Sequence, residues 1–119
     1  MFLRRPSVIA IVVLTLVVGN KGSASLAADP FSEAKDQAFE LGPVLARVSA
    51  CDGEAAREEL FHEFMTAKRK RGLDGSQTAT IAALVGGSES HAANGQAMEC
   101  SADDASRRAA LIGDMRKHW

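Results

Sequence analysis

Apolar side chains recur at steps of three and four along most of the chain, which is the period of one face of an α-helix. The first such pattern covers residues 30–50. Its apolar positions are Ala34, Ala38, Leu41, Leu45 and Val48. Asp29 can cap this helix, and Pro30 suits its first turn. The Gly42-Pro43 pair predicts a kink or a break, because proline lacks a backbone donor and crowds the preceding turn.

A second and clearer helical pattern covers residues 54–71. Its apolar stripe consists of Leu60, Phe61, Phe64 and Met65, extended by the stem of Lys68. Glutamates lie in its first turns and the basic run "KRKR" lies at its end. The charges at both ends therefore interact favourably with the helix dipole. Gly72 follows, and glycine favours the left-handed backbone that ends many helices.

The third helix is expected after "GLDG", where Asp74 and Gln77 have the spacing of a capping box. Its apolar face is formed by Ile81, Leu84 and Val85. The stretch that follows is rich in small residues. We expect the helix to be kinked at Gly86-Gly87 and to continue to about Met98.

A fourth helix is predicted over residues 102–117, and Ser101 with Asp104 again suggests a capped start. The side chains expected to face inward are Ala105, Ala109, Ile112 and Met115, with Leu111 beside them. No stretch keeps the two-residue alternation of a half-buried strand. The predicted fold class is therefore all-α, a small four-helix bundle with a kinked first helix.

The N-terminal stretch has the pattern of a secretory signal. Arg4 and Arg5 precede an apolar run over residues 8–18, and small residues follow around Ser25 and Ala27. The run is shorter than the roughly 20 residues of a membrane-spanning helix. An uncleaved anchor is the alternative, and it would be the chain's contact with a membrane. We expect a cleaved signal peptide at 1–27 and a helical domain at 28–119.

The chain has two cysteines, Cys51 and Cys100, and both lie beyond the signal. An even number of cysteines in an exported protein favours a disulfide. Such a bond would link the end of the first helix to the start of the fourth. It would close a loop of about 50 residues, for which chain entropy predicts about 4 kcal/mol of stabilisation. A redox-active or metal-binding pair is the alternative, but the C-x-x-C spacing of such pairs is absent.

The charge balance argues against nucleic acid as a partner. Cleavage after Ala27 would remove 3 of the 14 basic residues and leave 11 of them with all 15 acidic residues, a net charge of −4. Phosphate backbones are bound by basic surfaces. The basic run of residues 68–71 (Lys68, Arg69, Lys70 and Arg71) is a candidate partner surface. The alternative is a solvated helix end whose charge complements the dipole.

Motifs for catalysis or metal binding are weak. Glu59 and His62 have the E-x-x-H spacing of di-iron helix bundles, but such a site needs a second pair and two further carboxylates. These two residues are therefore only weak metal candidates. No nucleophile, phosphate loop or zinc motif is present, so the sequence indicates no cofactor and leans against an enzyme.

These observations favour an exported, non-enzymatic protein of the periplasm or the secreted fraction. Its expected partner is another protein of the cell envelope, with an accessory or chaperone-like role. In overall plan, with a signal, about 90 mature residues, helices and one long-range disulfide, the chain is similar to the periplasmic acid-stress chaperones. The alternative is a periplasmic carrier of a small molecule or a metal, with a pocket lined by Phe61, Phe64, Met65 and the small residues near Gly86.

Overall fold

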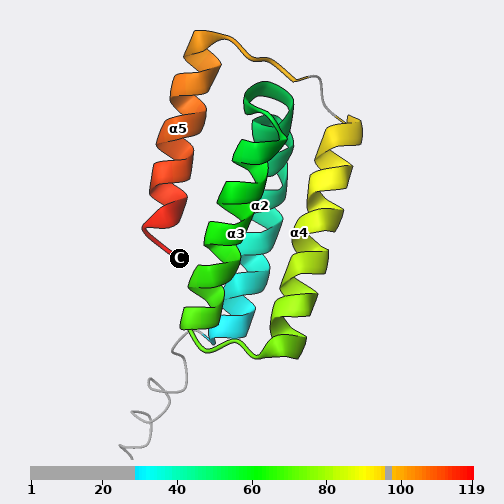
Figure 1. Cartoon of the computed structure of the whole chain (residues 1–119), viewed down its shortest axis with the longest axis vertical. Coiled ribbons are helices and arrows are strands. Elements are labelled where there is room, and N and C mark those ends of the chain that lie inside the picture. Colours follow the sequence, from blue (N-terminus) through cyan, green and yellow to red (C-terminus); the bar gives the residue numbers. More distant parts are fainter. Residues whose placement is uncertain (1–28, 96–97) are drawn as a thin grey trace, which may run out of the picture.

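The computed structural model describes residues 29–95 and 98–119, and these form four helices and no strand (Figure 1). The helices are α2 (Pro30–Asp52), α3 (Glu54–Lys70), α4 (Gly75–Gly95) and α5 (Ala102–Arg116). The all-α fold class is thereby confirmed. Within the described ranges, no helix has the length and apolar character needed to cross a membrane. The predicted signal peptide at 1–27 lies outside the described residues.

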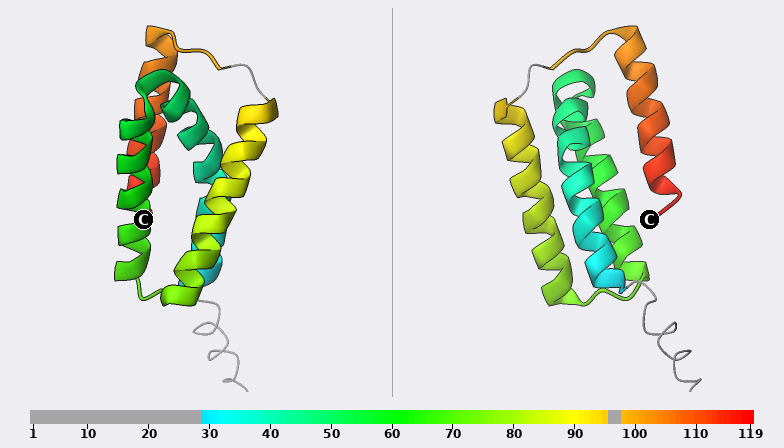
Figure 2. Two further views of the ribbon diagram at one scale, coloured as in Figure 1. Left: turned by 45° about the vertical axis from the view of Figure 1, so that its right-hand side comes forward. Right: turned by 180° about the vertical axis from the view of Figure 1, so that it is seen from behind.

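The first helix, α2, is longer than expected and runs through its proline. The carboxylate of Asp29 caps it by accepting a hydrogen bond from the Ser32 amide at 3.0 Å. Of the kink or break predicted at Gly42-Pro43, the break does not occur, and the helix is bent instead (Figure 2). The helix continues to Asp52, and Figure 2 shows its second half inclined to the first, away from α4. Gly53, with a φ of 100°, then separates α2 from α3.

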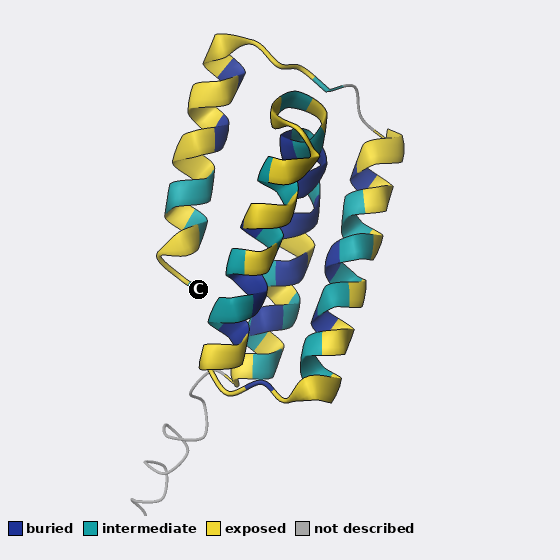
Figure 3. Cartoon of the chain, viewed as in Figure 1, coloured by how far each residue is buried: buried dark blue, intermediate teal, exposed yellow. Residues whose placement is uncertain are grey.

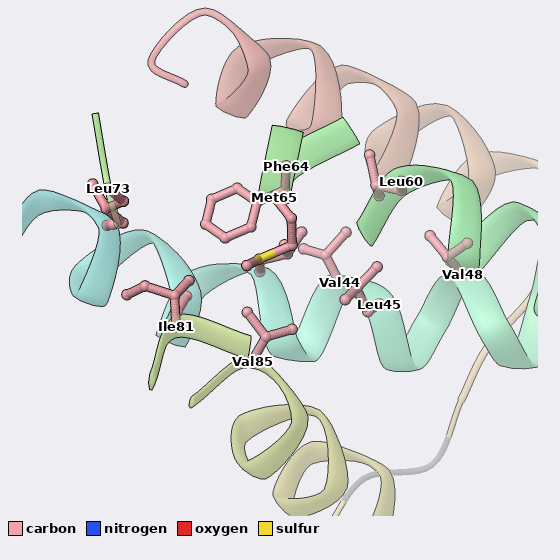
Figure 4. Packing of buried hydrophobic residues seen from close by; sticks show 12 residues of the cluster. Val44, Leu45, Val48, Leu60, Phe64, Met65, Leu73, Ile81 and Val85 are labelled. Carbon is pink, nitrogen blue, oxygen red and sulfur yellow. The ribbon is translucent and has the colours of Figure 1, made fainter. Parts of the chain in front are cut away.

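α2 is the central helix of the core, with α3 on one side of it and α4 on the other (Figure 2). The dark residues in Figure 3 gather on the faces that these three helices turn toward one another. Figure 4 shows Phe64 and Met65 of α3 close to Val44 and Leu45 of α2, with Ile81 and Val85 of α4 below them. The buried apolar cluster comprises Ala34, Ala38, Leu41, Val44, Leu45, Val48, Leu60, Phe64, Met65, Leu73, Ile81 and Val85.

The contact between α2 and α4 depends on small residues. Gly42 of α2 is buried directly beneath Ser88 of α4, and a Cβ at position 42 would overlap that side chain and lie 2.7 Å from the Glu89 amide nitrogen. The Ser88 hydroxyl bridges the two helices, with the Ala38 carbonyl oxygen at 3.2 Å and that of Val85 at 3.1 Å. The missing side chain of Gly42 thus sets how closely the two backbones approach.

The predicted start of α4 is confirmed, and its predicted end is too late. The Gln77 amide donates to the Asp74 carboxylate at 2.8 Å, and the Gln77 side-chain oxygen accepts from the Asp74 amide at 3.0 Å. This is the reciprocal capping box expected from the sequence. The helix continues through Gly86-Gly87 and ends at Gly95, so that Met98 lies beyond it.

The fourth helix, α5, lies beside the three-helix core, and its inner face is only in part the one predicted. Ser101 caps it as expected, accepting from the Asp104 amide at 3.1 Å. However, Ala105 and Ala109 are exposed, and the buried residues of α5 are Asp104 and Arg108. Ile112 and Met115 do face the core but are only partly buried, and Leu111 is exposed. Alanine contributes little on burial, so ion pairs rather than the alanines orient this helix.

The predicted disulfide is present between Cys51 and Cys100, whose Cα atoms are 5.4 Å apart. It joins the last turn of α2 to the residue that precedes the Ser101 cap. Disulfides form and persist in oxidising compartments, so the bond fits a protein outside the reducing cytosol.

The close approach of α2 and α4 predicts that Gly42→Ala will be destabilising, by about 1–3 kcal/mol in the free energy of unfolding, because a new methyl group must displace Ser88 or separate the helices. Gly87→Ala is the matched control, since a Cβ there meets no atom within 4 Å. The control should be neutral or slightly stabilising because alanine favours helix over glycine. Urea denaturation of both variants measures the difference, and equal stabilities would contradict the packing described here.

The disulfide encloses a sequence separation of 49 residues. We expect the double variant Cys51→Ala/Cys100→Ala to lose about 4 kcal/mol of the free energy of unfolding, since its unfolded chain is no longer restricted. Urea denaturation with and without a reductant measures this loss. The reductant should lower the midpoint of the parent protein and leave that of the double variant unchanged. A parent midpoint insensitive to reduction would contradict a stabilising role for the bond.

Candidate functional site

An open groove of about 670 Å³ lies between α2 and α5. It exists because α5 lies beside the core instead of packing closely on α2, an arrangement seen from behind in Figure 2. The groove is lined by Glu33, Asp36, Gln37 and Glu40 of α2, and by Leu111, Asp114, Met115 and His118 at the end of the chain. We call it the α2–α5 groove.

Four of the residues that line the α2–α5 groove are carboxylates, and two of these have no cationic partner. Glu33 lies 3.5 Å from Arg71, and Asp114 lies 3.6 Å from Lys117. Within residues 29–95 and 98–119, the side chains of Asp36 and Glu40 form no hydrogen bond or ion pair. Among the described residues, the α2 wall of the groove therefore carries negative charge that no cation balances.

The opposite wall combines apolar groups with polar ones. Leu111 is 49% exposed although it is a large apolar residue, and Met115 packs partly against the core. His118, which follows the C-terminal end of α5, also lines the groove, and its Nδ1 is 3.1 Å from the Asp114 carbonyl oxygen. The groove thus offers apolar contact on α5 opposite a row of carboxylates on α2.

Only three of the four residues in the basic run predicted as a partner surface are exposed. Lys68 is only 1% exposed, so it does not belong to an outer surface. Arg69, Lys70 and Arg71 are exposed, but the Arg71 Nε donates to the main-chain oxygen of Trp119 at 2.9 Å. Lys68 follows the core residues Phe64 and Met65 by one helical turn, and this position turns its side chain inward.

The buried ammonium group of Lys68 has two acceptors. Its Nζ donates to the side-chain oxygen of Gln37 and lies 3.4 Å from the main-chain oxygen of Trp119. It also lies 5.5 Å from the ring centroid of Phe64. Burial lowers the pKa of Lys68, and the positive charge of Arg71 lowers it further, while Glu33 opposes both effects. The sequence placed the stem of Lys68 on the apolar stripe of this helix, but its position in a run of four cations did not indicate that the ammonium group is buried.

A second polar cluster, which was not predicted from the sequence, holds the start of α5 against α2. The Asp104 carboxylate accepts from Arg47 of α2 at 2.9 Å and from Arg108, one turn later, at 2.6 Å. Arg108 also lies 3.2 Å from Asp52 of α2. We call these four residues the ion cluster. The only signal in the sequence was the spacing of Asp104 and Arg108, four positions apart on one helix face.

The other end of α5 is linked to α3. Arg116 donates two hydrogen bonds to the Glu63 carboxylate, at 2.7 and 2.9 Å, and these bonds raise the pKa of Arg116. The indole of Trp119 packs edge-on against Phe64, with ring centroids 5.1 Å apart. These contacts and the ion cluster hold α5 at both ends while the α2–α5 groove lies between them.

The weak metal candidates are not brought together with further ligands. Glu59 and His62 are both exposed on α3. In the described part of the chain, no group of three histidine, cysteine or carboxylate residues could hold a metal ion. Cys51 and Cys100 are joined in the disulfide, so their thiolates cannot act as ligands while it is intact.

A smaller cavity of about 390 Å³ lies between α2 and α4, two helices that diverge toward one end (Figure 2). Small residues such as Ala46, Ser49 and Ala93 line it, together with Met98. Its one acid, Glu89, is paired with Arg57 of α3 at 3.0 Å. This cavity therefore has little charge or specific polar chemistry to offer a ligand.

No family model, no curated protein and no solved structure matches this chain. The function is therefore inferred from the geometry of the α2–α5 groove and of the ion cluster that holds α5 against α2.

The buried position of Lys68 predicts a pH-dependent contribution to stability. Because its pKa is lowered in the folded chain, the unfolded chain binds more protons in the window just below its ordinary pKa of 10.5. The free energy of unfolding of the parent, relative to Lys68→Met, should therefore rise as the pH rises through this window and level off above it.

Urea denaturation of the parent and Lys68→Met between pH 7 and about pH 10 measures this trend, below the ordinary lysine pKa. Lys70→Met is the matched control, because Lys70 is exposed two residues further along. The control should show no comparable trend. A difference between the parent and Lys68→Met that is constant with pH would contradict the burial of a charged Lys68.

Proposed function

We propose that this chain is a non-enzymatic protein-binding factor of the cell envelope, with an accessory or chaperone-like role, and that its α2–α5 groove binds a basic amphipathic segment of a partner protein. The observation that supports this most directly is the row of carboxylates on α2 facing the exposed Leu111 of α5. A helix that presents lysines or arginines on one side and apolar residues on the other has the complementary pattern.

The negative charge of the α2 wall favours a basic partner segment over a neutral or acidic one. Asp36 and Glu40 lie one helical turn apart on α2 and have no cation beside them in the described residues. Each exposed ion pair with a partner would contribute about 0–1 kcal/mol, so these pairs select the partner more than they hold it. The larger contribution would come from covering Leu111 and Met115, since buried apolar area gives about 25 cal/mol per Å².

The alternative of a small-molecule or metal carrier has less support. The pocket proposed for it was to be lined by Phe61, Phe64 and Met65, but Phe64 and Met65 are buried in the close-packed core (Figure 4). The groove that does exist is open to solvent, and four carboxylates are among the residues that line it. Such a surface suits an elongated charged segment better than a small apolar molecule.

Export to the periplasm or secretion is part of the same proposal. It is supported by the disulfide, which persists in oxidising compartments, and by the signal-like pattern of residues 1–27. A partner in the same compartment would meet the groove directly.

A labelled model peptide tests the groove. We expect an amphipathic helix of leucine and lysine to bind the parent protein and to bind Asp36→Asn/Glu40→Gln at least about fivefold more weakly, since two ion pairs of about 0.5–1 kcal/mol are lost. Fluorescence anisotropy at low and high salt measures the dissociation constant. Salt should weaken binding to the parent more than to the double variant.

The matched control is Glu59→Gln/Glu99→Gln, which removes the same charge from two exposed positions outside the groove. It should leave the affinity within about twofold of the parent, because salt screens the interaction between the peptide and exposed charges that lie far from it. Two results would contradict the proposal: equal weakening by both double variants, or equal binding of a peptide in which glutamate replaces lysine.

A further inference from the structure

Phe39 of α2 is the most exposed large apolar side chain among the described residues, with 56% of its surface accessible. It follows Asp36 by three positions, and residues three apart are neighbours on a helix surface. Helical side chains lean toward the N-terminal end of their helix, so the ring of Phe39 points toward the turn that carries Asp36. Phe39 does not line the α2–α5 groove, but it borders the groove beside Asp36, which does.

Phe39 differs from the other phenylalanines that the structure describes, because each of those has a cation over its ring. The distances to the ring centroids are 4.6 Å for Lys35 over Phe31, 5.1 Å for Arg57 over Phe61 and 5.5 Å for Lys68 over Phe64. A cation at such a distance is attracted by the negative face of the ring. Within residues 29–95 and 98–119, no lysine or arginine lies over Phe39 in this way.

The charges nearest to Phe39 along α2 are a lysine that points elsewhere and two carboxylates. Lys35 precedes Phe39 by one helical turn, but its side chain leans toward the N-terminus and its Nζ lies over Phe31. Asp36 and Glu40 are both exposed, and neither has a cationic partner in the described ranges. Phe39 thus combines an open aromatic face with adjacent negative charge that no described cation balances.

An aromatic ring beside a carboxylate is better suited to arginine than to lysine. The planar guanidinium stacks on an aromatic face, whereas the ammonium of lysine is a compact and strongly hydrated charge. The edge of the guanidinium can at the same time donate two parallel hydrogen bonds to one carboxylate. Phe39 and Asp36 are close enough on one helix surface for a single arginine side chain to contact both.

We propose that Phe39 and Asp36 form an arginine-selective site at the edge of the α2–α5 groove, and that the partner segment bound in the groove places an arginine there. The guanidinium stacks on the ring of Phe39 and donates to the carboxylate of Asp36. This inference rests on the proposed function of the groove, and it specifies the chemistry of the partner. Phe39 selects arginine in that partner, while Leu111 and Met115 supply apolar contact inside the groove.

Two labelled model helices test this site. They have the same length and the same leucine positions, and every basic position is arginine in one and lysine in the other. We expect the parent protein to bind the arginine helix at least about threefold more tightly than the lysine helix, because arginine makes both the stacking and the paired hydrogen bonds. Fluorescence anisotropy measures the two dissociation constants, and their ratio is the arginine preference.

Substitutions of Phe39 connect the arginine preference to the ring. Phe39→Leu keeps an apolar side chain and removes the ring, and it should lower the preference at least about twofold. Phe39→Trp supplies a ring again and should restore the preference, because tryptophan is the strongest aromatic partner of cations. Phe61→Leu is the matched control, since it removes a ring outside the groove that already has Arg57 over it. The control should keep the preference within about 1.5-fold of the parent, because distant sites act independently.

The possible results separate this inference from the proposed function of the groove. If the parent binds both helices but shows no arginine preference, the arginine site is overturned and the groove proposal stands. The same holds if Phe39→Leu leaves the preference unchanged, if Phe39→Trp does not restore it, or if Phe61→Leu lowers it equally. If neither helix binds the parent, both proposals are overturned. A preference that is lost in Phe39→Leu alone and regained in Phe39→Trp supports the site.

Discussion

The covalent link between Cys51 and Cys100 holds in place a helix whose fully buried residues are charged and whose apolar residues are at most partly buried. The buried residues of α5 are Asp104 and Arg108, and its alanines face solvent. A helix with so little apolar burial gains little free energy by docking, so its position depends on a local restraint. The disulfide places the start of α5 beside the end of α2, and the ion cluster then forms over a short distance. The α2–α5 groove exists because of this arrangement.

The polar inner face of α5 also explains why the groove stays open. Buried ion pairs are often no more stabilising than apolar residues of the same volume, because desolvation of the charges offsets their attraction. An apolar residue at Asp104 or Arg108 would favour closer packing of α5 on α2, which would narrow the space between them. The ion cluster instead holds the helices at the distance set by two long side chains, Arg47 and Arg108. We regard this spacing as its structural role.

The structure of the core could be predicted from the sequence more fully than the position and inner face of α5. The helices, the Asp74 capping box and the disulfide followed from local patterns, since each depends on residues close in sequence or on the number of cysteines. The inner face of α5 did not, because Ala105 and Ala109 suggested an apolar stripe that tertiary ion pairs overrode. The stem of Lys68 was placed on the apolar stripe, but burial of its ammonium group was missed, since a cation among three others is usually solvated. The groove could not be predicted at all, because it depends on the distance between two helices far apart in sequence.

One side chain of α2 connects the α2–α5 groove to the contacts that hold the end of α5. Gln37 lines the α2–α5 groove, donates to the main-chain oxygen of His118 at 2.9 Å and accepts from Lys68. The end of α5 contributes Asp114, Met115 and His118 to the groove, while Arg116 pairs with Glu63 and Trp119 packs against Phe64, both on α3. The wall of the groove on α5 is therefore held in place by contacts with α3 that lie outside the groove. The groove depends in this way on all three of the helices α2, α3 and α5, although only two of them line it.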